Sequence, residues 1–189
     1  MTYEICKALC FLIVKLFCKI EVRGREVFPQ KGPFILASNH ISYLDPEVVG
    51  MLCPRQLNYL AKEELFQNKV FGAFLRKINV IPIKRGHVDL HVLRLSLKIL
   101  ENKPLLIFPQ GTRATNYDSF KEGVGFLYKK SRAPVIVAKV YGTDKVLPKG
   151  AKFLKYGKIK VIFSKVEGLE DQQTRHQVTA KVIETIKSL

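Results

Sequence analysis

Short apolar segments alternate with segments of helical periodicity between residues 33 and 140, and this alternation restricts the fold more than any other feature. The apolar segments have four to seven residues and are bounded by Pro, Gly, Asn or charged residues, so they predict β-strands. They are residues 33–38, 57–61, 80–83, 105–108 and 134–140. Helical patterns occupy residues 46–52, 70–78, 88–100 and 124–131, and a strand at 158–163 and a helix at 172–189 follow. Because strands separated by helices require crossover connections, we expect one α/β domain with a largely parallel or mixed sheet and helices on both faces.

The first 20 residues are expected to form a membrane-interface helix in front of a domain that spans residues 21–189. The segment is mostly apolar, but a spanning helix needs about 20 uninterrupted apolar residues. Four charged residues interrupt it, Glu4, Lys7, Lys15 and Lys19. On a helix the three lysines would lie near one another and large apolar side chains would cover the rest, a pattern typical of a helix in a membrane interface. No signal-peptide cleavage site follows. The alternative is a terminal helix that packs on the core.

The chain of 189 residues has 32 Lys and Arg against 16 Asp and Glu, a formal charge of +16. Such a surplus favours an anionic partner, which could be nucleic acid, acidic lipid or a phosphorylated substrate. The sequence shows no zinc finger, recognition helix or aromatic and basic stripe of the kind that binds nucleic acid, so we expect no nucleic-acid partner. Residues 139–165 carry eight lysines with Asp144 as the only acid, which fits either a membrane-facing patch or a solvated loop.

Candidate catalytic residues follow the first strand of the domain. Asn39 and His40 come directly after residues 33–38, and Asp45 lies five residues beyond the histidine. On a turn that leads into a helix, this spacing can fold the carboxylate back against the imidazole, which fixes its tautomer and makes a general base for a hydroxyl group. The alternative is ordinary: Asp45 could simply cap the helix that follows.

Two further loops place cations at the same edge of the sheet. Lys84 and Arg85 follow the strand at 80–83, and Gln110, Gly111, Thr112 and Arg113 follow the strand at 105–108. One guanidinium group can donate two parallel hydrogen bonds to phosphate oxygens. Gly111 permits the backbone to approach a substrate closely, and Thr112 adds a hydroxyl donor. Two arginines near a histidine therefore predict a phosphorylated substrate beside a base.

Other reactive residues give weaker signals. Cys6, Cys10, Cys18 and Cys53 lack metal-type spacing and are interpreted as free thiols in a reducing compartment. Neither Cys53 nor the serines at 38 and 42 lie in a GxSxG setting, so a serine or cysteine hydrolase is a poor second choice. His87, Asp89 and His91 suggest a metal site, and at the start of a helix the two histidines would share one face. A third and a fourth ligand have no candidate, because Asp89 serves equally as an acid in the first turn, and we expect no metal site. His176 is expected at the surface.

Four segments together resemble the conserved blocks of the glycerolipid acyltransferases related to 1-acyl-glycerol-3-phosphate acyltransferase. Asn39-His40 through Asp45 resembles the NHxxxxD signature, and residues 80–85 resemble the second block. Residues 108–113 and 133–138 resemble the FPEGTR block and the fourth block. The blocks occur in the family's order and cover nearly the whole chain.

This resemblance implies transfer of an acyl chain from a coenzyme A or acyl carrier protein thioester to the sn-2 hydroxyl of 1-acyl-glycerol-3-phosphate, which gives phosphatidic acid. It implies His40 as base and Asp45 as its partner. Arg85, Arg113 and, with less support, Lys84 would hold the phosphate. Asn39, Gln110, Gly111 and Thr112 would position the substrate, and backbone N–H groups near Gly111 would stabilise the oxyanion.

The resemblance also implies a setting for the reaction. We expect no cofactor, contact with membrane lipids including anionic phospholipid, and a peripheral or monotopic location at the cytoplasmic face of the cell membrane. One residue departs from the family pattern: Gln110 stands where the family usually has Glu. The alternatives are therefore an acyltransferase for another lysolipid, or a catalytically weakened lipid-binding relative.

Overall fold

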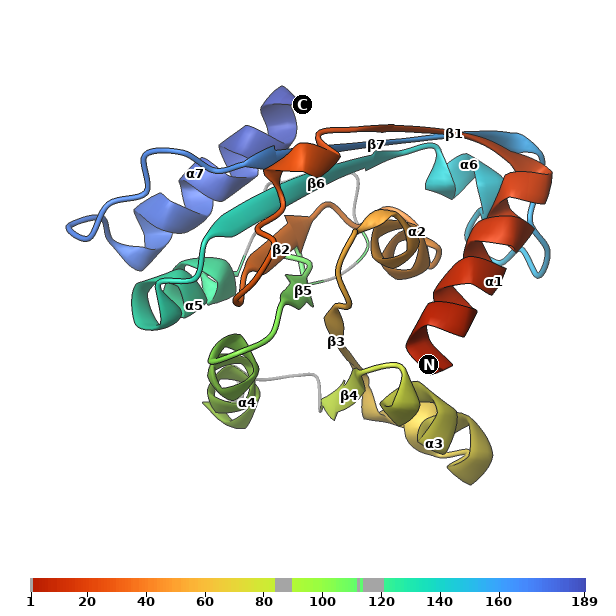
Figure 1. Cartoon of the computed structure of the whole chain (residues 1–189), viewed down its shortest axis with the longest axis horizontal. Helices are drawn as coiled ribbons and strands as arrows, with labels where there is room; N and C mark the ends of the chain where they lie inside the picture. Colours follow the sequence, from red (N-terminus) through yellow and green to blue (C-terminus); the bar gives the residue numbers. More distant parts are fainter. Residues whose placement is uncertain (1, 84–89, 112, 114–120) are drawn as a thin grey trace.

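The computed structural model describes residues 2–83, 90–111, 113 and 121–189. Within these residues a single mixed sheet of seven strands crosses the molecule in the order β1-β7-β6-β2-β5-β3-β4 (Figure 1). The strands are β1 (Cys18–Arg23), β2 (Ile35–Ser38), β3 (Asn58–Lys62), β4 (Val80–Ile83), β5 (Leu105–Ile107), β6 (Val135–Tyr141) and β7 (Gly157–Lys165). All neighbouring pairs are parallel except β6 and β7, which are antiparallel. The predicted sheet type is confirmed.

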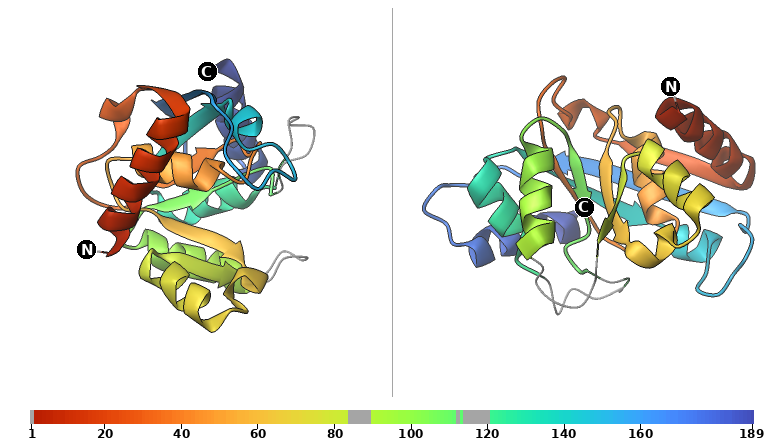
Figure 2. Two further views of the ribbon diagram at one scale, coloured as in Figure 1. Left: turned by 90° about the vertical axis from the view of Figure 1, so that its right-hand side faces the viewer. Right: turned by 90° about the horizontal axis from the view of Figure 1, so that it is seen from below.

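Helices cover both faces of the sheet, as the crossover argument requires (Figures 1 and 2). The α-helices are α1 (Thr2–Phe17), α2 (Asp45–Leu52), α3 (Lys69–Lys77), α4 (Leu90–Leu100), α5 (Gly123–Ser131), α6 (Thr143–Val146) and α7 (Arg175–Ser188), with 3-10 turns η1 (Arg25–Val27) and η2 (Glu63–Phe66). The predicted strands of the domain agree with the structure to within two residues at each end. The short α6 was not predicted, because four residues are too few to establish a helical period.

Strand alternation divides the core into two apolar clusters, one on each face. In β2, Leu36 belongs to the cluster that α1 and α2 cover, whereas Ile35 and Ala37 belong to the cluster that α4, α5 and α7 cover. Successive side chains of a strand point to opposite faces, so a strand buried on both sides has a continuous apolar sequence. All four residues of β2 are buried. The central strands are therefore fixed from both sides, and the loops at their carboxyl ends start from rigid positions.

The N-terminal segment differs from its prediction. The helix ends at Phe17, and Cys18–Arg23 forms the edge strand β1 beside β7. The three lysines do not share one helix face, because Lys19 is on β1 and the Lys7 ammonium donates to the carbonyl oxygen of Cys53. Apolar character alone could not separate the end of the helix from a short strand, since both contain similar residues.

One side of α1 packs on the domain and the opposite side is exposed. Tyr3 and Val14 are buried, and the Tyr3 hydroxyl accepts a hydrogen bond from the Leu57 N–H at 3.1 Å. The exposed large apolar side chains of α1 are Ile5, Leu9, Phe11, Leu12, Ile13 and Leu16. The helix therefore contacts the core and also presents an apolar outer face, and its binding to a membrane interface stays a prediction. No helix within the described ranges is long and apolar enough to cross a membrane.

Candidate functional site

The candidate site lies where β2, β5 and β6 end. These strands are parallel and adjacent, with Ser38 of β2 in register with Ala138 of β6. In an open α/β sheet, the carboxyl ends of the strands form the edge at which functional loops meet. The loop at residues 39–44 and the turn at residues 108–111 therefore converge there, although about 70 residues separate them along the chain.

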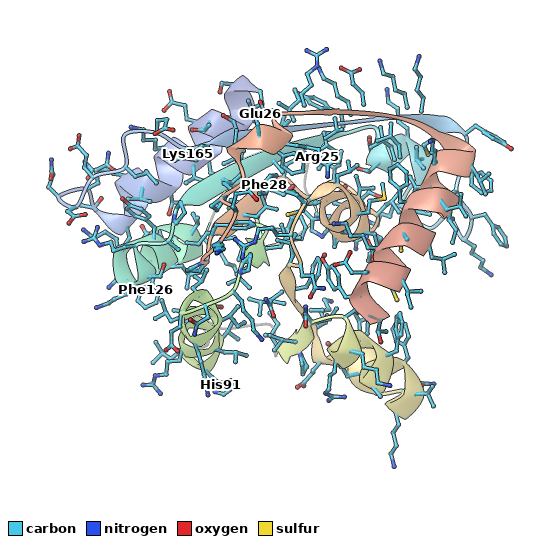
Figure 3. All side chains as sticks on the ribbon, viewed as in Figure 1. Arg25, Glu26, Phe28, His91, Phe126 and Lys165 are labelled. Carbon is cyan, nitrogen blue, oxygen red and sulfur yellow. The ribbon has the colours of Figure 1, made fainter. Side chains whose placement is uncertain are left out.

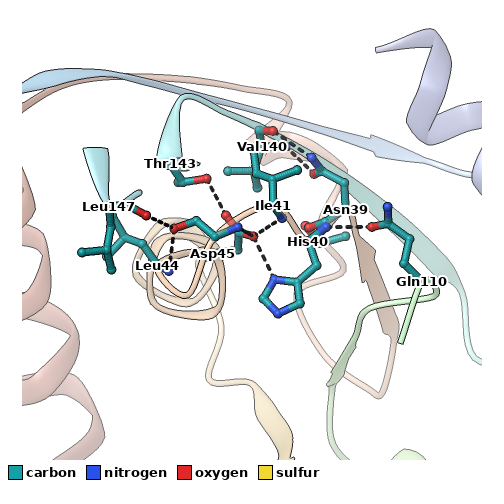
Figure 4. A network of polar contacts seen from close by, with 11 residues as sticks. Asn39, His40, Ile41, Leu44, Asp45, Gln110, Val140, Thr143 and Leu147 are labelled. Atoms are coloured by element: carbon teal, nitrogen blue, oxygen red, sulfur yellow. Dashed lines mark hydrogen bonds and ion pairs between the residues drawn. The ribbon is translucent and has the colours of Figure 1, made fainter. Parts of the chain in front are cut away.

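Asn39 attaches the first loop to β6. Its side-chain amide donates to the Val140 carbonyl at 2.8 Å and its Oδ1 accepts from the Val140 N–H at 2.7 Å (Figure 4). The side chain thus forms the same pair of hydrogen bonds that another strand residue would form. Asn39 is buried, so these bonds also satisfy polar atoms that have lost contact with water. Asn39 fixes the backbone on which the next residue, the histidine, is carried.

Asp45 organises the loop around its carboxylate. Oδ2 accepts from the backbone N–H groups of Ile41 at 2.6 Å and Ser42 at 2.8 Å, and Oδ1 accepts from the Thr143 hydroxyl at 2.5 Å (Figure 4). The side chain has no exposed surface, and α2 gains no side-chain cap from it. Asp45 therefore folds back onto the preceding loop, and the interpretation of Asp45 as a simple helix cap is wrong.

His40 is held between Asp45 and an aromatic ring. Its Nδ1 lies 2.8 Å from Asp45 Oδ2, and its ring stacks on Phe108 with 4.2 Å between the ring centroids. A carboxylate oxygen only accepts, so Nδ1 carries the proton and the lone pair is on Nε2. Nε2 points away from Asp45 (Figure 4), and the His40 side chain is 12% exposed. The arrangement gives a fixed, nearly buried imidazole with its basic nitrogen directed outward.

Gln110 holds the second loop against the first. Its side-chain Oε1 accepts from the backbone N–H of His40 at 2.9 Å, and the residue is 7% exposed. A turn sets this position: Gly111 has a φ of 69° and donates its N–H to the Phe108 carbonyl at 2.9 Å. That φ favours glycine. The N–H of Gly111 is thus engaged within its own turn, and stabilisation of an oxyanion by other backbone N–H groups near Gly111 stays a prediction.

A pocket of about 150 Å³ opens beside the loop at residues 39–44. It is lined by Ile41, Ser42, Tyr43, Arg113, Leu147 and Lys149. The Arg113 guanidinium carbon lies 3.3 Å from the centre of the Tyr43 ring, a cation–π contact that limits where the guanidinium can point. Among the described residues, two cations and no acid line the pocket, so this lining favours an anionic group.

Five residues named in the sequence analysis lie outside the described part of the chain: Lys84, Arg85, His87, Asp89 and Thr112. No group of three or more metal-ligating side chains occurs among the residues that the structure does describe. His91 lies on α4, at the lower side of the molecule in Figure 3 and away from α2.

The residues considered for hydrolase chemistry are engaged elsewhere. Ser42 Oγ donates to the Leu147 carbonyl at 3.1 Å, and Ser38 Oγ donates to the Asn39 carbonyl at 3.0 Å. Burial raises the pKa of the Cys53 thiol to about 11, so hardly any thiolate exists at neutral pH. None of the three is paired with a general base in these hydrogen bonds.

Three contributors escaped the sequence analysis: Thr143, Phe108 and Lys149. Phe108 was assigned to a strand and to the block at residues 108–113 but was given no role at the site, and Thr143 follows the end of β6 after a turn at Gly142. Lys149 was one of eight lysines in a basic segment and nothing distinguished it from the others. Each is recognised only because the chain brings it back beside the loop that follows β2.

Comparison with known proteins gives a consistent result. The sequence model of the Acyltransferase family matches residues 19–141. The 1-acyl-sn-glycerol-3-phosphate acyltransferase of Bacillus subtilis is 31% identical over 162 residues, which are 85% of this chain and 79% of that protein. The lyso-ornithine lipid O-acyltransferase of Pseudomonas aeruginosa is 33% identical over 103 residues, 53% of this chain and 38% of that protein.

A solved structure shares the fold. The crystal structure of the 1-acyl-sn-glycerophosphate acyltransferase PlsC from Thermotoga maritima superposes with a TM-score of 0.79 and 22% sequence identity. The aligned region covers 98% of this chain and 77% of that one. The similarity therefore extends over the mixed sheet and its covering helices.

Proposed function

The chain belongs to the acyltransferase family, and from that premise we propose that it transfers an acyl chain from a thioester to the sn-2 hydroxyl of 1-acyl-glycerol-3-phosphate. The products are phosphatidic acid and the free thiol of the acyl donor. The observation that carries the proposal is the 2.8 Å bond between His40 Nδ1 and Asp45 Oδ2, which leaves Nε2 free to act as a base.

The chemistry follows from this pair. Nε2 of His40 takes the proton of the lysolipid hydroxyl while the hydroxyl oxygen forms a bond to the thioester carbonyl carbon. The buried Asp45 carboxylate stabilises the positive charge that develops on the ring. When the tetrahedral intermediate collapses, the C–S bond breaks and the imidazolium returns its proton to the thiolate. No covalent acyl-enzyme and no cofactor is needed.

Phosphate recognition is assigned to cations at the same edge of the sheet. Arg113 lines the pocket beside the histidine loop, and we assign Arg85 and Lys84 to the same phosphate by their place after β4. The described lining of the pocket holds two cations and no acid, which favours a phosphate head group over a zwitterionic one. A different lysolipid substrate, such as the lyso-ornithine lipid of the Pseudomonas relative, is the competing assignment.

The setting of the reaction is proposed as well. The exposed apolar face of α1 would bind the membrane interface at the cytoplasmic side, where lysolipid and acyl thioester meet. Anionic phospholipid would be attracted by the chain's surplus of positive charge. The proposal includes the acyl thioesters of both coenzyme A and acyl carrier protein as donors.

The test is turnover of lysophosphatidic acid with acyl-coenzyme A and with acyl carrier protein thioesters, compared with lyso-ornithine lipid as acceptor. Replacing His40 by Ala should lower kcat by about 10²–10⁴ or more, the range for loss of a general base, with little change in melting temperature. His176→Ala is the matched control, because His176 is an exposed histidine on α7. Near-wild-type turnover by a folded His40→Ala variant would refute the assignment.

A further inference from the structure

Two exposed aromatic rings mark the connection between α6 and β7, which we call the 147–156 loop. Phe153 is 83% exposed and Tyr156 is 82% exposed. The loop itself is anchored, because Leu154 packs against the core and the Lys155 N–H donates to the Val146 carbonyl at 2.8 Å. Large apolar rings held in water by an anchored loop indicate a contact surface rather than a frayed connection.

The charge of this segment specifies what the surface contacts. Residues 147–158 contain four lysines and no acidic residue. The lysines are Lys149, Lys152, Lys155 and Lys158, and all four are exposed. Aromatic rings are stable at the boundary between the acyl chains and the head groups of a bilayer, and lysines are attracted to the phosphates of an anionic leaflet. The combination matches an anionic bilayer.

The loop continues the apolar surface of α1. The rings of Tyr156 and Phe17, at the end of α1, lie with their centroids 5.4 Å apart. Figures 1 and 2 show α1 and the loop at the same end of the molecule, the right-hand end in Figure 1. The loop and the exposed apolar face of α1 can therefore contact one flat membrane together.

We propose that the 147–156 loop is a second membrane-binding element, which inserts Phe153 and Tyr156 into an anionic bilayer beside α1. The same loop reaches the candidate site, because the Leu147 carbonyl accepts from Ser42 Oγ and Lys149 lines the pocket. Docking of the loop thus places the pocket at the membrane surface, where a lysolipid resides. This inference goes beyond acyl transfer and its test does not depend on activity.

A fluorescence reporter tests the insertion directly. The chain contains no tryptophan, so Tyr156→Trp introduces a single indole at the proposed contact. With vesicles of equal parts phosphatidylglycerol and phosphatidylcholine, its emission should shift to the blue and be quenched by brominated acyl chains. Leu90→Trp is the control: this residue is 63% exposed on α4, away from α1, and should show neither effect.

A second pair of variants measures the contribution to binding. In the full chain, Phe153→Ser with Tyr156→Ser should weaken vesicle binding by about tenfold, equivalent to about 1.4 kcal/mol. Lys152→Gln with Lys155→Gln should weaken binding to anionic vesicles only, whereas the exposed Lys103→Gln with Lys130→Gln should change it less.

The proposal fails if the Tyr156→Trp variant binds vesicles but its emission is neither shifted nor quenched, because α1 would then be the contact by itself. It also fails if acyl carrier protein without lipid shifts the emission while vesicles do not, because the loop would then be a protein-binding surface. Loss of lipid insertion with retained turnover, or the reverse, separates this inference from the proposed acyl transfer.

Discussion

Replacing Asp45 by Asn should lower kcat by about 10³ while leaving the fold intact. In the proposed reaction a positive charge develops on His40, and Asp45 Oδ2 lies 2.8 Å from its Nδ1. With these two atoms in hydrogen-bond contact, we take about 4 Å as the order-of-magnitude separation of the two charge centres. At an effective dielectric constant of about 20, that separation corresponds to about 4 kcal/mol. Because each 1.36 kcal/mol of barrier is a factor of ten, the loss is about 10³ in rate.

The hydrogen bonds around residue 45 explain why the Asp45→Asn variant should still fold. The side-chain oxygen of Asn can accept from the backbone N–H groups of Ile41 and Ser42 in place of Oδ2. Its amide nitrogen then faces the Thr143 hydroxyl, which can rotate and accept instead of donate. The variant therefore loses charge but leaves few buried polar atoms unsatisfied, so kcat should fall more than binding or melting temperature.

The assay is initial-rate formation of phosphatidic acid over a range of lysophosphatidic acid concentrations, with thermal melting of the same samples. Thr143→Val is the control, because it removes one hydrogen bond to the carboxylate but keeps the negative charge of Asp45. We expect the free energy of unfolding of this variant to fall by about 1 kcal/mol. Should folded Asp45→Asn retain kcat within tenfold of wild type, stabilisation of a developing imidazolium by Asp45 would be refuted.

Three further outcomes are expected. Gln110→Glu should change kcat by no more than about tenfold, because either side chain can accept from the His40 N–H. Gln110→Met should lower the free energy of unfolding by about 1–3 kcal/mol, because it leaves that partly buried N–H without its acceptor. An inactive wild type rescued a hundredfold by Gln110→Glu would support the weakened relative. Leu9→Ser with Leu12→Ser, both on the outer face of α1, should release protein from vesicles in a sedimentation assay without lowering the melting temperature; unchanged sedimentation would argue against α1 as an anchor. Cys53 should be the slowest cysteine to alkylate in the folded chain at pH 8, since burial raises its pKa to about 11. Early modification of Cys53, detected by mass spectrometry, would contradict that pKa.

The sequence alone determined the fold class and the pairing of His40 with Asp45 after β2. Short apolar strands that alternate with helical patterns have few packing solutions, and their order sets a mainly parallel sheet with covered faces. The five-residue spacing from His40 to Asp45 is local, so a turn can bring the two together whatever the rest of the chain does. Local periods and local spacings are readable from the sequence because they need no knowledge of distant segments.

Contacts between distant segments were decided only by the tertiary structure. The hydrogen bond between Gln110 and the His40 N–H spans 70 positions, and the one between Thr143 and Asp45 spans 98. The local sequence therefore predicts neither of them. The division of residues 1–20 into α1 and β1 was also beyond the sequence, because only pairing with β7, near the other end of the chain, makes Cys18–Arg23 a strand. β-Pairing and side-chain contacts depend on which segments the fold places side by side, and that information belongs to the whole chain.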